Sequence, residues 1–83
     1  MEIKDIYEMN LPSRAILVYE NLNFRAGSKR KCWPSVRCIA NDTGLSTRTV
    51  RRAIDDLRNA GLIITYHRIR KSGAWSSLLY ELM

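Results

Sequence analysis

Two short apolar stripes, on segments separated by a four-residue break at 43–46, constrain the fold of this chain more than any other feature. Each stripe has the i, i+3, i+4 spacing of a buried helix face, and together they comprise Val36, Ile39 and Ala40, then Val50, Ala53, Ile54 and Leu57. In the break, Gly44 can end the first helix and Ser46 can cap the second. Ala40 is small enough to let the helices cross closely. The segment therefore predicts two crossed helices joined by a tight turn.

An earlier segment predicts a further helix. Proline suits the first turn of a helix, so the helix is expected to start at Pro12 and to stop near Gly27. Its apolar stripe consists of Ala15, Val18, Tyr19 and Leu22. Ile16 and Leu17 widen this stripe, so we expect the helix to be buried on more than one side. The helix after Ser46 is expected to run to Ala60 and to stop at Gly61.

After Gly61 the pattern changes from helix to strand. Residues 62–70 are rich in β-branched and aromatic types, residues 71–74 signal a turn, and residues 75–82 alternate, with one face formed by Ser76, Leu78, Tyr80 and Leu82. This predicts a two-stranded β-hairpin. Cys32 and Trp33 form a short extended piece, because Pro34 biases the preceding residue away from helix. The fold class is therefore mostly α with a small β-hairpin (α+β), with residues 1–11 as an N-terminal extension and residues 12–83 as one domain.

The charge of the chain favours an anionic partner. Its 83 residues carry 14 Lys and Arg against 8 Asp and Glu, a net charge of +6. The imbalance lies in residues 25–83, which hold twelve of the basic residues and only four acidic ones. For so short a chain this excess points first to nucleic acid and second to a membrane surface.

The outward face of the helix after Ser46 is basic. On a helical wheel Arg48 and Arg52 point directly away from the apolar stripe, and Arg51 lies on one flank. Two helices around a glycine turn, with a basic second helix, indicate a DNA-binding helix-turn-helix. The alternative is an ordinary helical hairpin with a solvated arginine face.

The sequence also resembles a known family. The residues that carry the resemblance are Trp33-Pro34-Ser35, then Ile39-Ala40, Gly44-Leu45-Ser46, Arg48-Thr49-Val50, Arg52-Ala53-Ile54, Leu57 and Gly61-Leu62-Ile63. They are similar to the winged helix-turn-helix domains of bacterial transcriptional regulators and of phage and plasmid replication proteins. The resemblance implies a three-helix core with a two-stranded wing, in which residues 46–60 form the recognition helix and the hairpin forms the wing.

Contacts with double-stranded DNA are expected from two places. A recognition helix presents its N-terminal residues to base edges in the major groove, where arginine reads guanine; the candidates for these contacts are Thr47, Arg48, Arg51 and Arg52, whereas Ser46 and Thr49 are expected to bind phosphate or to cap the helix. Ser46 is expected mainly to cap the helix, and Arg58 to contact Asp55 or Asn59. The wing candidates are Arg68, Arg70 and Lys71, whose alternative role is a charged edge that prevents strand aggregation. A third basic spot, residues 29–31, serves either DNA or solubility.

Other functions find little support in the sequence. Cys32, Cys38 and the single histidine, His67, do not make a zinc site, so we expect reduced thiols, no metal and no cofactor. No nucleophile or phosphate-loop motif appears, and no enzyme is predicted. The absence of a signal peptide or long apolar stretch predicts a cytoplasmic protein without membrane segments.

Three functions stay open at this stage. The first is a sequence-specific transcriptional regulator that binds double-stranded DNA. The second is the origin-binding domain of a phage or plasmid replication initiator. The third is a winged helix that serves only as a protein–protein interaction module. A homodimer through residues 1–24 is also predicted, with Ile3, Ile6, Tyr7 and the first helix making the self-contact.

Overall fold

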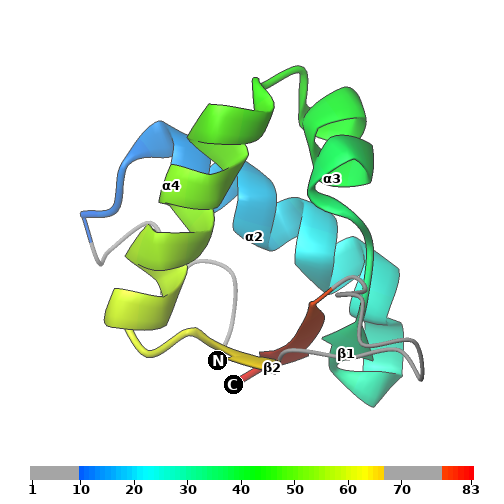
Figure 1. Cartoon of the computed structure of the whole chain (residues 1–83). Helices are drawn as coiled ribbons and strands as arrows, with labels where there is room; N and C mark the ends of the chain where they lie inside the picture. Colours follow the sequence, from blue (N-terminus) through cyan, green and yellow to red (C-terminus); the bar gives the residue numbers. More distant parts are fainter. Residues whose placement is uncertain (1–9, 67–77) are drawn as a thin grey trace.

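Three helices pack over a small antiparallel sheet (Figure 1). A computed structural model describes residues 10–66 and 78–83. Helix α2 (Ser13–Ala26) packs against both α3 (Val36–Thr43) and α4 (Thr47–Asn59) and also contacts the sheet. The order of helices and the α+β class agree with the sequence prediction. The predicted contact residues Ile3, Ile6 and Tyr7 lie outside the described residues.

Helix α2 follows the predicted bounds. It begins after Pro12 and ends at Gly27, whose φ of +57° lies in the left-handed region that glycine adopts readily. A short 3₁₀ turn, η1 (Gly27–Lys29), continues from it. The predicted stripe is buried, comprising Ala15, Val18, Tyr19 and Leu22.

The prediction that α2 is buried on more than one side was wrong for Leu17, which is 42% exposed, although Ile16 is partly buried against the core. The described helices and strands pack on one side of α2, so a residue beyond the edge of its stripe still faces outward. Phe24, seven residues after Leu17, is more exposed still, at 87%. An apolar residue on a helix therefore marks a core face only where its spacing matches the rest of the stripe.

The sheet has three strands where a two-stranded hairpin was predicted. Its strands are β1 (Lys31–Cys32), β2 (Ile63–Tyr66) and β3 (Leu79–Leu82), in the order β1-β3-β2. Both pairings are antiparallel, with Cys32 opposite Tyr80 and Thr65 opposite Tyr80 on the other side. The extended piece predicted at Cys32 is thus an edge strand that pairs with the last strand. The remainder of the predicted hairpin, including His67, Trp75 and Ser76, lies outside the described residues.

The core draws on every helix and strand of the described chain. Its largest fully buried side chains are Val18, Tyr19, Leu22, Ile39, Val50, Leu57, Leu62 and Tyr80. Tyr80 and Leu82 are buried and Leu78 is partly buried, as the alternation in this segment predicts. The sheet covers one end of the helical bundle, where α2 contacts β1 and β3 and α4 contacts β2 (Figure 1).

Arg30 ties the loop after η1 to the end of β3. Its backbone adopts a left-handed conformation, with φ of +59°. Its carbonyl accepts a hydrogen bond from the Leu82 amide at 2.8 Å, and its guanidinium donates to the Met83 carbonyl at 2.6 Å. The Met83 amide in turn donates to the Leu62 carbonyl at 3.0 Å. These bonds hold the last strand between two segments that are distant in sequence.

Tyr80→Phe should stabilise the domain at high pH. The Tyr80 hydroxyl is buried and has no hydrogen-bond partner among the described residues, and burial, with a smaller effect of Cys32, raises its pKa to about 12 from 10.0. The folded state binds the Tyr80 hydroxyl proton more tightly than the unfolded state does, so protonated Tyr80 favours folding. This contribution to stability is complete below pH 10 and is lost as the pH rises towards 12. That difference corresponds to roughly 2–3 kcal/mol.

Urea unfolding at neutral and alkaline pH measures the effect. At neutral pH Tyr80→Phe should be neutral or stabilising by up to about 1 kcal/mol, because it removes an unsatisfied buried hydroxyl. At pH 11.5 the wild type should lose more stability than the variant does. If the wild type and Tyr80→Phe lost the same amount of unfolding free energy at pH 11.5, the raised pKa could not belong to Tyr80.

Candidate nucleic-acid interface

The turn between α3 and α4 is built by local hydrogen bonds. Ser35 caps α3 by accepting from the Cys38 amide at 3.1 Å, and Gly44 ends that helix with φ of +77°. Thr43 Oγ1 donates to the Ile39 carbonyl at 2.7 Å and accepts from the Leu45 amide at 3.4 Å. The chain therefore leaves α3 in one fixed direction, which sets the angle at which α4 begins.

Ser46 and Thr49 share the first turn of α4. The Ser46 hydroxyl accepts from the Thr49 amide at 3.1 Å and donates to Thr49 Oγ1 at 2.9 Å. The capping role expected for Ser46 is thus confirmed. Beyond the cap, Ala40 and Ile54 are buried and Leu45 is partly buried where the two helices meet, so the predicted close crossing is present.

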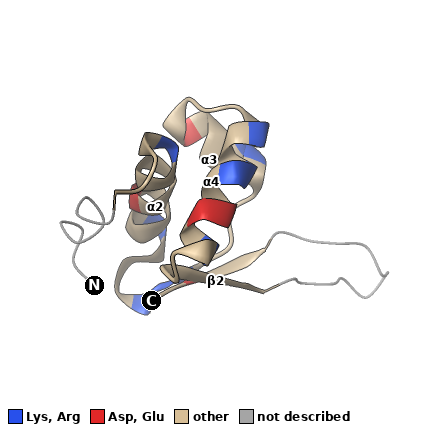
Figure 2. Ribbon diagram, turned by 90° about the vertical axis from the view of Figure 1, so that its left-hand side faces the viewer, with Lys and Arg blue, Asp and Glu red and all other residues tan. Residues whose placement is uncertain are grey.

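Helix α4 presents an exposed basic face. Val50, Ala53, Ile54 and Leu57 are buried on one side, whereas Thr47, Arg48, Arg51 and Arg52 are exposed. None of these three arginines forms an ion pair with another described residue. Figure 2 shows the basic positions in the first half of α4, with acidic ones farther along the helix. Cations that form no ion pair with this described part of the chain keep their charge available to an outside anion.

The second half of α4 is held by ion pairs. Arg58 lies 3.5 Å from Asp55 on the same helix, as the sequence predicted. Asp56 accepts from Arg14 Nε of α2 at 2.9 Å, which ties the base of α4 to the core. Arg25 and Asn21 of α2 contact Asp42 of α3, and the Asn21 and Arg25 hydrogen bonds lower the pKa of that carboxyl. The two helices of the turn are therefore each anchored to α2.

A shallow cleft of about 270 Å³ lies between one side of α4 and the residue before β3. It is lined by Val36, Arg51, Ile54, Asp55, Arg58 and Leu78. Leu78 directly precedes β3, so the Arg51 side of α4 adjoins the start of that strand. The predicted wing residues Arg68, Arg70 and Lys71 lie outside the described residues.

The structure also shows what the sequence reasoning missed. Arg37 was not among the predicted DNA-binding residues, yet it is exposed in the first turn of α3. The proline-serine helix start directly before it is the sequence signal that could have identified it as an exposed cation. The basic spot at residues 29–31 divides, since Arg30 binds the end of β3 and Lys31 pairs with Glu81 at 3.5 Å. Of the three, Lys29 is the one whose side chain forms neither an ion pair nor a hydrogen bond with the described residues.

The cysteines are free thiols, Cys32 buried and Cys38 exposed. Burial raises the pKa of the Cys32 thiol, opposed by the charge of Arg25. Within residues 10–66 and 78–83 there is no cluster of three or more His, Cys, Asp or Glu suited to a metal ion. Across the same residues, no helix is both long and apolar enough to cross a membrane.

Comparison with known proteins supports the architecture. The family described as a helix-turn-helix domain matches residues 9–63, which include α2, α3 and α4. A solved chain described as a possible transcriptional regulator from Methanosarcina mazei Go1 has a similar fold, with a TM-score of 0.72 at 14% identity. The similarity covers 100% of this chain and 67% of that one. No curated protein matches significantly.

The family match covers more than half of the sequence, and the structural similarity extends over the sheet as well as the helices. The α3–turn–α4 unit has the geometry of the helix-turn-helix, a DNA-binding motif, and the antiparallel sheet gives it the winged form. The chain belongs to the family of helix-turn-helix domains.

Proposed function

We propose that this domain binds double-stranded DNA sequence-specifically, with α4 in the major groove, and that it regulates transcription. The observation that carries the proposal is that Arg48, Arg51 and Arg52 are exposed outside the fully buried stripe of α4 and form no ion pair with the described residues. A helix that buries one face offers the opposite face to a groove. The regulatory role is supported by the solved chain of similar fold that is described as a possible transcriptional regulator.

The residues divide into base and phosphate contacts. Arg48 and Arg52 lie opposite the buried stripe, so they would reach base edges, where arginine can make two hydrogen bonds to guanine. Arg51, on the side next to β3, and the Thr49 hydroxyl would contact the backbone. Thr47 lies exposed at the start of the helix and would reach bases with its short side chain. Arg68, Arg70 and Lys71 are proposed to add phosphate contacts from the wing.

The homodimer stays a prediction. Helix-turn-helix proteins often bind paired half-sites about one helical turn apart. Within the described part of residues 1–24, Leu17 and Phe24 are exposed apolar residues on α2. A second copy that packed on α2 would leave α4 accessible.

Arg48→Ala should separate recognition from general affinity. On a site selected from random duplexes, the variant should bind about 1–3 kcal/mol more weakly, whereas a scrambled duplex should lose much less. Stability should change by under about 0.5 kcal/mol, because the side chain is exposed. Fluorescence anisotropy with both duplexes measures the difference.

Two controls make the result specific. Arg58→Ala removes the same side chain from the same helix, but at a position paired with Asp55, so it should affect the selected site less. Arg70→Ala should weaken both duplexes equally and flatten the salt dependence by about one. An equal loss on both duplexes for Arg48→Ala would make Arg48 a phosphate contact. Absence of any duplex binding at low salt would instead favour a protein interaction module.

A further inference from the structure

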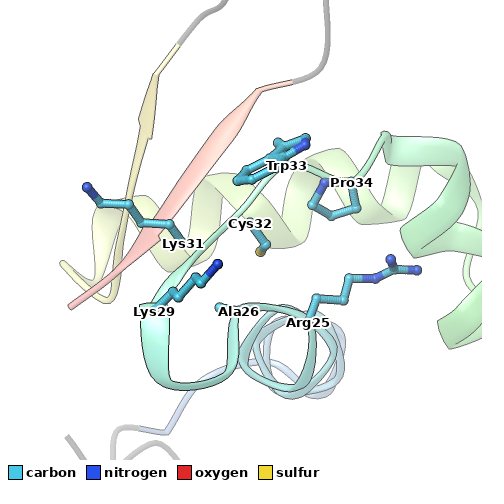
Figure 3. Close-up of a pocket in the computed structure, with 7 residues that line it drawn as sticks. All are labelled: Arg25, Ala26, Lys29, Lys31, Cys32, Trp33 and Pro34. Atoms are coloured by element: carbon cyan, nitrogen blue, oxygen red, sulfur yellow. The ribbon is translucent and has the colours of Figure 1, made fainter.

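A second surface feature lies where the C-terminal end of α2 meets β1. An open, shallow cavity of about 370 Å³ is lined there by Arg25 and Ala26, Lys29, the residues of β1, and Trp33 with Pro34 (Figure 3). None of the described residues that line it belongs to α4. Its volume falls near the lower end of the range of small-molecule sites. The cavity is therefore large enough for a compact organic ligand and separate from the proposed recognition face.

The charge of the lining favours an anion. Lys31 is turned towards Glu81, 3.5 Å away, and Arg25 contacts Asp42. Lys29 is exposed, forms no ion pair within the described chain, and extends its ammonium group into the space below Trp33 (Figure 3). No carboxylate is among the described lining residues, and burial raises the pKa of the Cys32 thiol, which favours its uncharged form. Lys29 is the cation with which an anionic ligand would pair.

The opposite wall of the cavity is aromatic. Trp33 is 57% exposed, and its indole lies with the Pro34 ring across the space from Lys29 (Figure 3). The paired strand β1 and the helix cap at Ser35 hold the backbone on both sides of these two residues. In proteins that bind unpaired nucleotides, the bases stack on aromatic side chains and nearby cations neutralise the phosphates. Trp33 and Lys29 supply one group of each kind.

We propose that this cavity binds a nucleotide, with the base stacked on Trp33 and the phosphate held by Lys29. A base joined to a phosphate occurs both in a free mononucleotide and in an unpaired nucleotide of a DNA strand. The same two contacts would bind either one. The described lining residues include none from α4, so a duplex seated on that helix would not compete with the nucleotide for the same side chains.

Tryptophan fluorescence provides the test. The chain has two tryptophans, so Trp75→Phe leaves Trp33 as the sole reporter. Titration with adenosine 5′-monophosphate should quench this signal in a saturable way, whereas adenosine and inorganic phosphate should each bind at least about tenfold more weakly, since each lacks one of the two contacts. A 5′-phosphorylated oligodeoxyadenylate strand then separates the sources: tighter binding of the strand indicates an unpaired nucleotide, and equal or weaker binding indicates a free one.

Matched variants identify the residues. In the same background, Lys29→Gln should weaken mononucleotide binding about tenfold, while Arg48→Gln, which removes the same charge from α4, should leave it unchanged. By calorimetry, Trp33→Leu should weaken it by a similar factor. Lys29→Gln should bind a selected duplex with wild-type affinity. A failed nucleotide titration therefore counts against the nucleotide site alone, and a failed duplex titration counts against the proposed DNA binding alone. The proposal is overturned by the absence of saturable quenching at millimolar nucleotide, by equal effects of Lys29→Gln and Arg48→Gln, or by a glutamate-rich peptide that binds where the nucleotide does not.

Discussion

Replacing Arg48, Arg51 and Arg52 together by glutamine should reduce duplex affinity at least about a hundredfold, with the fold retained. Each lost phosphate contact should flatten the dependence of log K on log salt by about 0.9, and each lost base contact adds about 1–3 kcal/mol on the selected site. All three side chains are exposed and form no ion pair with the described residues, so the stability cost should be small. Anisotropy titrations at several salt concentrations measure both quantities.

A triple variant of equal charge provides the comparison. Arg25→Gln, Lys29→Gln and Lys31→Gln together also remove three cations, but from residues that line the cavity beside β1. If α4 is the DNA-binding surface, this protein should retain most of its duplex affinity. Similar losses in the two triple variants would show that net charge, rather than the face of α4, determines binding. An α4 variant that binds within about threefold of wild type would exclude α4 as the DNA-binding surface.

Leu57→Ala should cost about 2–5 kcal/mol of unfolding free energy. Leu57 is 0% exposed on the inner face of α4, where it joins the core formed with α2 and the sheet. A small domain has a total stability of about 5–15 kcal/mol, so this single change should lower the urea midpoint substantially. Leu17→Ala makes the same chemical change at a residue that is 42% exposed, and it should cost under about 1 kcal/mol. Equal losses would place Leu17 in a buried contact.

The helices could be predicted because their signals are local. Pro12, Gly27, Gly44 and Gly61 mark boundaries through backbone constraints that act at the residue itself, and the buried stripes follow from the 3.6-residue period. The basic face of α4 could be predicted for the same reason, since the side opposite a buried stripe is exposed. Whether Arg48 reads a base is a property of the complex, and the periodicity of one chain cannot supply it.

Tertiary pairings were beyond the reach of the same reasoning. Cys32 looked like a short extended piece, but its pairing with Tyr80 depends on a strand almost fifty residues away. Leu17 looked like part of a stripe, and only the direction from which other elements approach α2 decides that it is exposed. The three cations of residues 29–31 are alike in sequence, yet they differ in structure because the end of β3 and Glu81 lie beside two of them.

The strand order β1-β3-β2 has a consequence for how the chain folds. Among the described strands the last one along the sequence is central, so β1 and β2 find no partner within this part of the chain until residues 79–82 arrive. During synthesis the three helices can form early, because their hydrogen bonds are local, but the core cannot close before Tyr80 and Leu82 have left the ribosome. Such long-range closure slows folding relative to a simple helical bundle, and completion of the domain coincides with the emergence of its final strand.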